Sequence, residues 1–507
     1  MKVNLLNRPG YTEAPDIAPF KNDLVQDLVL DPILEIMGKG DSYVQQQCRT
    51  ALLTPLTDRA NLLHRQSALR DAIRNSKTVL QLYATVAEVV TDISNYKTSH
   101  RNGNPLPAVR VLNAVEQLDL LAHGLERLKD VIVATYGHFT GVIFRDFYDA
   151  FLKEFNADFV RLVHEKAALL RKSGDDDGEI QISGRIGTGL KSEGFIVNML
   201  SEYQSKRKHD IIDSLFSTKI RKNEIRISYD DLELNRDCRD LESAGLLHVA
   251  STFDGFSVEL MRMFNSLRQQ LAFYHGCCNL YNQMKNLCFP VCFPELGMTG
   301  SHAITGEAFY DLGVALREKR LPATNDLTGE DTIAYLITGT NHGGKTTFIR
   351  SIGASQLMAQ CGMFVPAKSM ITQIFTGIYT HFVRNEDVTM TSGKLEEELR
   401  RLSKIVDCMS SGSLILLNES FATTSERDGA AIAEDIIRAF YDNEITCFFV
   451  THIYAYAKKA YDAGIPRMQF LQAERTEEGE RTYRMKQGEP GATGYGMELY
   501  DEIIGCR

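Results

Sequence analysis

The chain has 507 residues, of which 44% are hydrophobic and 24% are charged, as in an ordinary globular protein of roughly two to four domains. Its formal net charge of −10 argues against indiscriminate binding of polyanions, although it leaves room for a local basic surface. No apolar run approaches the roughly 20 residues that span a bilayer, and no signal peptide is recognisable, so we expect a cytoplasmic protein with no membrane partner.

Ten cysteines are scattered along the chain without the spacing of a disulfide framework. Four of them are close in sequence, and either a zinc site or buried thiols would explain Cys277, Cys278, Cys288 and Cys292. The spacing is not of the paired C-x-x-C type, and the neighbouring residues are apolar and helical in pattern, so buried reduced thiols are favoured. Reduced thiols fit a reducing compartment.

The N-terminal half is predicted to be helical. Residues 1–40 are weakly patterned and read as an extended lead-in with one short amphipathic helix, Leu24–Met37. A break at Pro55 follows, with Asp58 as N-cap of the next helix. Further helices are expected at residues 42–73, 76–96, 109–136 and 144–173, with a polar loop at 100–107.

A different pattern interrupts the helices between residues 175 and 235. Residues 178–200 alternate polar and apolar side chains with several glycines, which predicts strands. Basic residues then concentrate, and they would either contact a nucleic-acid phosphate backbone or form a solvated charged face: Lys206, Arg207, Lys208, Lys219, Arg221, Lys222 and Arg226. A long helix is expected at 237–286, ending before Pro290.

From about residue 297, short apolar strands alternate with helices, which indicates an α/β sheet with helical crossovers and a domain boundary near 290–300. Within this part, AYLITGTNHGGKTTFIRSI (334–352) is a buried strand, a glycine-rich loop and a helix start. It fits the pattern G-x-x-x-x-G-K-S/T of phosphate-binding loops. The predicted phosphate-binding residues are Gly339, Thr340, Asn341, His342, Gly343, Gly344, Lys345, Thr346 and Thr347.

Lys345 is expected to reach the β- and γ-phosphates of a nucleotide and the Thr346 hydroxyl to bind Mg²⁺. The strand LILLNE ends in Asn418, expected to hold Mg²⁺ through water, and Glu419, expected to activate the attacking water. His452 ends a further strand and is expected to sense the γ-phosphate. An ordinary strand-end carboxylate is the less favoured alternative for Glu419. Taken alone, His452 would more often be a structural histidine, but its place in the order of motifs favours the sensing role. ATP and Mg²⁺ are thus the expected cofactors.

The order of these segments, with Ser392-Gly393 opening a charged helix between them, resembles ABC-type ATPases and, more closely, the MutS family of DNA mismatch-repair ATPases. GTNHGGKTT is similar to that family's GPNMGGKST, LILLNES with TTSERDG to its LVLMDE with GTSxxDG, and Thr451-His452 to its ATH. Further similar segments are CGMFVPA (361–367), GATGYG (491–496), Asn325-Asp326 near the adenine, and PLTDRANLLHRQSALRDAI (55–73). The resemblance covers residues 41–507.

This resemblance implies a multidomain α+β protein. Its expected parts are an N-terminal extension (1–40), an all-α core and lever domain (41–295) with a clamp-like insertion near 175–235, and an α/β ABC-type P-loop ATPase domain (296–507). It also implies a homodimer through the ATPase domains, with ATP between subunits and Ser392 acting in trans. DNA would be the partner, bound as duplex or branched structures in repair or recombination.

Three departures from the family pattern limit the expectation. The core-like pattern begins near residue 41, so mismatch-reading and connector domains are not expected, nor is mismatch specificity. No Smr-type segment follows Arg507, which argues against the Smr-tailed branch. Asn418 replaces the family's aspartate, which predicts weaker Mg²⁺ binding and slower turnover. The alternative is a slow or non-hydrolysing ATP-driven assembly switch acting on a protein or ribosomal partner. A transporter half or an SMC-like ATPase is disfavoured, because neither a membrane span nor a long heptad arm is found.

Overall fold

The computed structural model describes residues 1–11, 16–100, 107–156, 158–159, 161, 163–165, 180–186, 192–200, 232–298, 300, 304–384, 393–476 and 480–491. The chain forms two compact units. Unit 1 contains Met1–Val3, Leu80–Gly137 and Asp146–Arg268, and unit 2 contains Asn4–Val79, His138–Arg145 and Gln269–Arg507. The basic residues between Lys206 and Arg226, and Ser392, lie outside the described residues.

Unit 1 is mainly helical. It holds most of α5 (Ser76–Ser99) and α7 (Val142–Glu154), all of α6 (Pro107–Ala134) and the first part of α9 (Leu232–Asn286). β1 (Ile180–Ile186) and β2 (Ser192–Leu200) pair antiparallel in the region predicted to contain strands. The predicted long helix is confirmed as α9, which begins five residues before the expected start (232 against 237).

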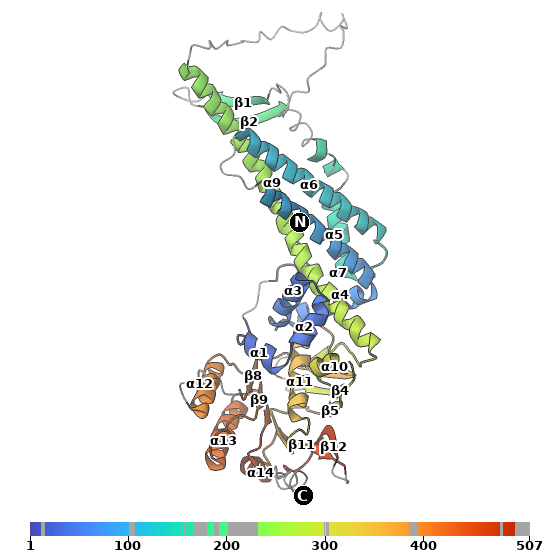
Figure 1. Cartoon of the computed structure of the whole chain (residues 1–507), viewed down its shortest axis with the longest axis vertical. Helices are drawn as coiled ribbons and strands as arrows, with labels where there is room; N and C mark the ends of the chain where they lie inside the picture. Colours follow the sequence, from blue (N-terminus) through green and yellow to red (C-terminus); the bar gives the residue numbers. More distant parts are fainter. Residues whose placement is uncertain are drawn as a thin grey trace, which may run out of the picture. The chain divides into compact units, whose positions relative to one another are not determined.

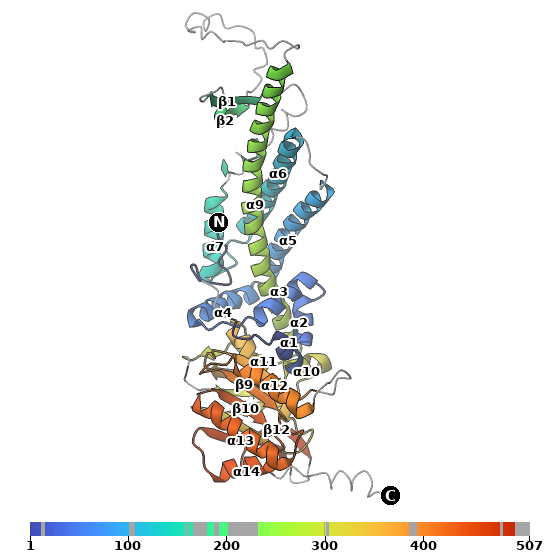
Figure 2. The ribbon, with the colours of Figure 1, turned by 90° about the vertical axis from the view of Figure 1, so that its left-hand side faces the viewer.

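Helices α5 and α6 pack closely side by side (Figures 1 and 2). A Cβ added to Gly124 would lie 2.7 Å from Val89 Cγ1, so the glycine permits this approach. At the interface Tyr96 donates a hydrogen bond to Glu116 (2.8 Å), and Arg127 donates one to Asp92 (2.9 Å). Replacing Gly124 by any larger residue would push the two helices apart.

Two helix predictions were wrong in their extent. The expected helix Leu24–Met37 is two helices, α1 (Lys21–Asp27) and α2 (Asp31–Gly38). Between them Val29 has a φ of 53°, a left-handed conformation that no α-helix continues through. The helix expected at 144–173 is interrupted after Glu154, where α7 ends. The Asn156 side chain accepts a hydrogen bond from the Phe159 amide (2.9 Å), and the described residues 158–159, 161 and 163–165 are helical again.

In unit 2, α3 (Ser42–Leu52) and α4 (Arg59–Arg74) follow, and Asp58 caps α4 as predicted, accepting from the Ala60 amide at 2.8 Å. Helix α4 is anchored on the α/β part of the unit. Arg65 donates to the carbonyl oxygen of Cys361 (3.4 Å), and Gln66 donates to that of Pro294 (3.1 Å). The helical segment before residue 80 therefore packs as part of unit 2.

The N-terminal segment covers the edge strand β8 (Ile378–Phe382) of the main sheet. The Ile17 carbonyl accepts from the Ile378 amide (3.0 Å), and Arg384, just after β8, bonds with both Asp23 and Asp27 of α1 (2.9 Å each). Such cover protects the unpaired backbone groups of an edge strand. The weakly patterned lead-in is thus a structural component of unit 2.

The main sheet has the strand order β12-β11-β6-β10-β9-β8. Strands β8 to β11 and β6 run parallel, and β12 pairs antiparallel with β11. Its further members are β6 (Ala334–Thr338), β9 (Leu414–Asn418), β10 (Thr446–Val450), β11 (Met468–Arg475) and β12 (Arg481–Gln487). A second sheet has the order β3-β7-β4-β5, from β3 (Glu295–Leu296), β7 (Ser369–Thr372), β4 (Ile304–Phe309) and β5 (Asn325–Leu327).

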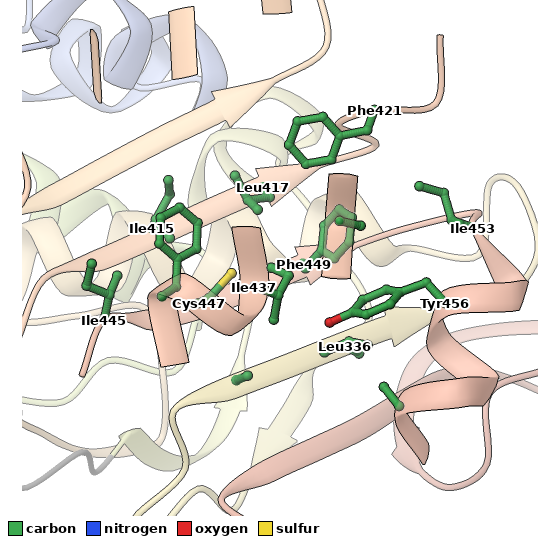
Figure 3. Packing of buried hydrophobic residues seen from close by; sticks show 14 of the residues in the cluster. Leu336, Ile415, Leu417, Phe421, Ile437, Ile445, Cys447, Phe449, Ile453 and Tyr456 are labelled. Carbon is green, nitrogen blue, oxygen red and sulfur yellow. The ribbon is translucent and has the colours of Figure 1, made fainter. Parts of the chain in front are cut away.

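Helices cover both faces of the main sheet, so the described part of the chain has a mixed α/β fold. On one face Leu336, Leu417 and Phe449 pack against Ile437 of α13 (Glu426–Asp442) and Tyr456 of α14 (Tyr454–Asp462) (Figure 3). On the other face Leu416 contacts Gly353 of α11 (Lys345–Gln360), where an added Cβ would lie 2.5 Å from Leu416 Cδ1. The remaining helices of unit 2 are α10 (Leu312–Glu318) and α12 (Lys394–Val406).

The clustered cysteines divide by burial. Cys277 and Cys278 are buried free thiols, as predicted, and Cys292 is half-buried. Cys288 is exposed, so the prediction was wrong for this residue; its φ of 56° places it in the turn that ends α9. Within the described ranges these four thiols do not form a group that could hold a metal ion. In those same ranges, no helix combines the length and the apolar character needed to cross a bilayer.

Candidate nucleotide site

The predicted phosphate-binding loop connects β6 to α11 in unit 2. The backbone turns through positive φ at Gly339 (121°), His342 (59°) and Gly344 (90°), which brings backbone N–H groups to one side of the loop. Gly344 is required on two grounds: its conformation disfavours other residues, and an added Cβ would lie 3.1 Å from the carbonyl oxygen of Tyr483. Helix α11 begins at the next residue, so its N-terminus faces the loop.

Strand β11 supports the loop from behind. An added Cβ at Gly339 or at Gly343 would lie 2.9 Å from the Cβ of Ala473. The small side chain of Ala473 therefore allows the loop to lie directly against the strand. Thr340, in the same loop, has a buried hydroxyl with no hydrogen-bond partner among the described residues.

Lys345 is only 4% exposed, and its ammonium group donates hydrogen bonds to the carbonyl oxygens of Gly339 (3.0 Å) and Thr340 (2.8 Å). Burial lowers the pKa of Lys345 to about 8, and the nearby negative charge of Glu419 partly opposes this shift. The loop thus holds a cation whose desolvation is only partly compensated. An anionic group in the loop would compensate it further.

Thr346 and Asn418 meet across the site, as expected for a metal-binding pair. The Thr346 hydroxyl, in the first turn of α11, donates to Oδ1 of Asn418 at the end of β9 (3.0 Å). Both side chains are half-buried and present oxygen atoms, which Mg²⁺ prefers. Asn418 supplies no negative charge.

Glu419 and His452 also lie together. Nε2 of His452 is 3.1 Å from Oε1 of Glu419, and this hydrogen bond is the largest cause of a lowered pKa of Glu419. Glu419 follows β9 with a φ of 58°, and its amide donates a hydrogen bond to the carbonyl oxygen of Val450 at the end of β10 (2.9 Å). Glu419 is therefore a carboxylate at neutral pH, with its backbone and one oxygen held in place.

Lys345, Thr346 and Glu419 border an open cavity of about 620 Å³. Its lining residues are Asn341, His342, Gly343, Gly344, Lys345, Thr346, Thr347, Glu419 and Tyr483. The buried cation, the unpaired Thr340 hydroxyl and the glycine positions that a Cβ would fill all suit a polyphosphate, and the Thr346–Asn418 pair suits a divalent cation. The residues present therefore fit ATP with Mg²⁺.

A second cavity of about 320 Å³ adjoins the first and shares Gly344, Thr347 and Tyr483 with it. Asn325 lines this cavity and fixes β12 beside it. Its Oδ1 accepts from the Met485 amide (2.7 Å), and its Nδ2 donates to the Tyr483 carbonyl oxygen (3.5 Å). The segment predicted to lie near an adenine thus borders a space next to the phosphate loop.

Helix α12 is tied to the segment after β9 through Glu398. The Glu398 carboxylate accepts from the Phe421 amide (3.2 Å) and the Thr423 hydroxyl (3.4 Å), and burial raises its pKa. His381 of β8 joins the same group, with Nδ1 2.8 Å from the Ser420 hydroxyl and Nε2 3.2 Å from the Glu398 carbonyl oxygen. A neutral ring that donates from Nε2 and accepts at Nδ1 satisfies both contacts.

Acid is expected to destabilise the protein through His381. Burial, together with the positive charge of Arg401, lowers the pKa of His381 to about 3. In the unfolded chain His381 would bind a proton near pH 6.5, whereas in the folded chain it stays neutral down to about pH 3. The free energy of unfolding therefore decreases as the pH falls below 6.5. Between pH 7 and pH 5 the parent should lose about 2 kcal/mol of unfolding free energy more than His381→Gln, as measured by urea unfolding. The exposed His100, changed to Gln, is the control; equal pH dependence of parent and His381→Gln would contradict the expectation.

The cavity brings together the predicted residues from Asn341 to Thr347 with Glu419. Gly339 and Thr340 lie behind Lys345, and His452 reaches the site through Glu419. The sequence analysis missed Tyr483, Glu398 and His381. Tyr483 stands in the polar strand RTYRMKQ, where nothing in the sequence marks its φ of 58° or its position over the loop.

Two protein-family models match the chain. The model of the family described as "MutS2 N-terminal domain" matches residues 57–287, and the model described as "MutS domain V" matches residues 335–503. The second match begins in β6 and includes the phosphate-binding loop, Asn418, Glu419 and His452.

Three curated relatives illustrate the similarity. DNA mismatch repair protein MutS of Thermus aquaticus is 32% identical over 166 residues, which cover 32% of this chain and 20% of the relative. DNA mismatch repair protein MutS 2 of Haloarcula marismortui is 28% identical over 229 residues (42% and 24%). DNA mismatch repair protein Msh3 of Homo sapiens is 27% identical over 232 residues (39% and 20%). The matches span between a fifth and a quarter of the length of these relatives. With both family models matching in order on one chain, and the second covering the site, this protein belongs to the MutS family.

Proposed function

We propose that the protein is a Mg²⁺-dependent ATPase that acts as a homodimeric, nucleotide-switched clamp on duplex or branched DNA in repair or recombination. One observation carries the catalytic part: Lys345, Thr346 and Glu419 line one cavity within unit 2, and Asn418 accepts a hydrogen bond from Thr346. The relatives' names describe DNA mismatch repair, and that supports DNA as the partner.

The residues have separate roles in this proposal. Lys345 exchanges its hydrogen bonds to the loop carbonyls for bonds to the β- and γ-phosphates of ATP. Thr346 and, through water, Asn418 would hold Mg²⁺, which when bound would neutralise charge on the phosphoryl oxygens. Glu419 orients a water molecule and accepts its proton at a carboxylate oxygen. His452 keeps the Glu419 carboxylate oriented and responds to the γ-phosphate.

The adjoining 320 Å³ cavity is proposed to receive the base of the nucleotide. Tyr483 borders both cavities and would therefore lie between the base and the phosphates. Asn325 fixes this position through its two bonds to β12.

The dimer and the DNA contacts rest on the family resemblance. Ser392 of one subunit would face the γ-phosphate in the other, and helix α12, which begins at Lys394, directly follows it. The proposed DNA-contacting residues are Lys206, Arg207, Lys208, Lys219, Arg221 and Lys222.

A second candidate function follows from Asn418. An amide next to Thr346 accepts the same hydrogen bond as a carboxylate but attracts Mg²⁺ less. The protein would then hold ATP for long periods and act as an assembly switch on a protein or ribosomal partner.

Steady-state ATP turnover with Mg²⁺, with and without linear and branched duplex DNA, tests the proposal. We expect DNA to stimulate turnover several-fold, with an effect that falls steeply as salt rises, because phosphate contacts release counterions. Exchange of Lys206, Arg207 and Lys208 for Ala should remove the stimulation and leave basal turnover unchanged.

Nucleotide-dependent dimerisation without DNA affinity at low salt would contradict the DNA clamp and support the switch. Absence of ATP binding altogether would contradict both, since both require the phosphate loop.

A further inference from the structure

A cluster of metal-ligating side chains lies in unit 1, which contains none of the residues of the nucleotide site. Helix α6 presents Asp119, His123 and Glu126 at positions i, i+4 and i+7, which share one face of a helix. His164, in the segment after α7, contributes a second imidazole. One ligand atom each from Asp119, His123 and His164 lies within 4.8 Å of the others.

The contacts within this cluster are short and mutual. Nδ1 of His164 is 2.8 Å from Oδ1 of Asp119, and Nε2 of His123 is 3.7 Å from Oδ2 of the same carboxylate. Glu126 also touches both rings, at 3.3 Å from His123 Nδ1 and 3.3 Å from His164 Nε2. The two imidazole centroids are 4.5 Å apart. Three potential ligands, Asp119, His123 and His164, thus surround one small volume, and Glu126 contacts the other nitrogen of each ring.

Hydrogen bonding alone leaves part of this cluster unsatisfied. Nε2 of His164 is shielded from solvent, and its contact with Glu126 lacks the geometry of a hydrogen bond. A divalent cation bound here would give the imidazoles a partner through a nitrogen lone pair and would be attracted by the neighbouring carboxylates.

We propose that Asp119, His123 and His164 bind one Zn²⁺ ion. Two nitrogens and one carboxylate oxygen form a borderline ligand set that suits Zn²⁺ better than Mg²⁺ or Ca²⁺, which take oxygen ligands. Glu126, which contacts the other nitrogen of each ring, would hold the imidazoles in the required orientation. His123 is 58% exposed, so the ion can enter from solvent.

The ion would join two segments of unit 1. Asp119 and His123 belong to α6, and His164 belongs to the chain that follows the end of α7 at Glu154. Binding would fix His164 and its described neighbours to α6 and stabilise unit 1 by mass action. The proposal goes beyond the nucleotide-dependent function and does not depend on it.

Calorimetric titration of the full, chelator-treated chain with ZnCl₂, in the absence of nucleotide, tests the site. The Cys288→Ser background removes the exposed thiol of the cysteine cluster. We expect one ion per chain with micromolar or tighter affinity. His123→Ala and His164→Ala should each weaken binding about 100-fold, and Asp119→Asn, of the same shape, about 10- to 100-fold. The control is His100→Ala, an exposed histidine that stacks on Tyr96.

Thermal unfolding shows whether a variant has lost only the zinc site or has lost its folded structure. Without zinc the isosteric Asp119→Asn chain should unfold at the parent temperature; with zinc only the parent and the His100→Ala control should be stabilised. ATP binding should be the same in all variants. Absence of a stoichiometric site tighter than about 100 μM, or affinity unchanged by Asp119→Asn and both histidine variants, would overturn the proposal.

Discussion

Lys345→Met is expected to abolish ATP binding and to stabilise the nucleotide-free protein. Methionine keeps the length of the side chain but removes the ammonium group, so roughly 100-fold or more in ATP affinity should be lost with its charged hydrogen bonds. Burial lowers the pKa of Lys345 to about 8 from 10.5, so at neutral pH the charged group opposes folding by on the order of 3 kcal/mol. The variant should therefore unfold at a higher temperature than the parent.

This stabilisation should depend on pH. The unfolded chain binds more protons than the folded chain between pH 8 and pH 10.5, because the folded pKa of Lys345 is the lower one. The parent therefore gains stability relative to Lys345→Met as the pH rises through this window. We would measure the unfolding temperatures of the parent and of Lys345→Met at pH 7.5 and 9.5; the difference between them should be smaller at pH 9.5.

The matched control is Lys368→Met, which removes an exposed lysine that pairs with Glu307 on the second sheet. It should leave ATP binding unchanged. Retained ATP binding in Lys345→Met would mean that the loop is not a phosphate site. A variant less stable than the parent at pH 7.5 would show that the two bonds to Gly339 and Thr340 outweigh the desolvation of the amine.

Asn418→Asp is expected to lower the Mg²⁺ concentration for half-maximal ATP turnover about tenfold, equivalent to about 1.4 kcal/mol, and to raise the maximal rate. The aspartate can still accept the hydrogen bond from Thr346, now 3.0 Å long, and it adds the negative charge that favours Mg²⁺. Turnover measured across a Mg²⁺ titration provides the readout.

Two variants control this experiment. Asn418→Ala removes the amide oxygen without changing the net charge, and should raise the Mg²⁺ requirement. Asn443→Asp adds the same net charge at an exposed position after α13 and should change nothing. If Asn418→Asp had the same Mg²⁺ requirement as the parent, Asn418 would not take part in binding Mg²⁺. Turnover in Asn418→Asp but none in the parent would favour the assembly switch.

The outline of the nucleotide site was predictable because its parts are local. The segment around Lys345 carries a strand, a glycine loop and a helix start within consecutive residues, and each is encoded by neighbouring side chains. Asn418 and Glu419 follow a run of buried residues, which marks the end of a central strand. Because parallel strands end at the same edge of a sheet, strand-end residues from distant segments meet there.

The breaks in two helices were not predictable from periodicity. The hydrophobic spacing continues through Val29 and past Asn156, so the pattern alone indicates uninterrupted helices. The left-handed turn at Val29 lies between α1, which packs on β8, and α2, which packs on α3 and α10. After α7, the Asn156 side chain accepts a hydrogen bond from the Phe159 amide and begins a new helical segment. The helix boundaries were thus decided by tertiary contacts near Val29 and by one local hydrogen bond at Asn156, against the helical hydrophobic spacing of the sequence.

By itself the sequence determined the family resemblance, the glycine-rich loop and the residues proposed to carry its chemistry, because those depend on consecutive residues and their order. Only the tertiary structure decided that Tyr483 lies over the loop, that Glu398 ties α12 to the segment after β9, and that residues 16–27 cover an edge strand. The same is true of the meeting of His164 with Asp119. These contacts join segments far apart in the chain, and their partners are selected by crossover connections and packing, which leave no periodic pattern in the sequence.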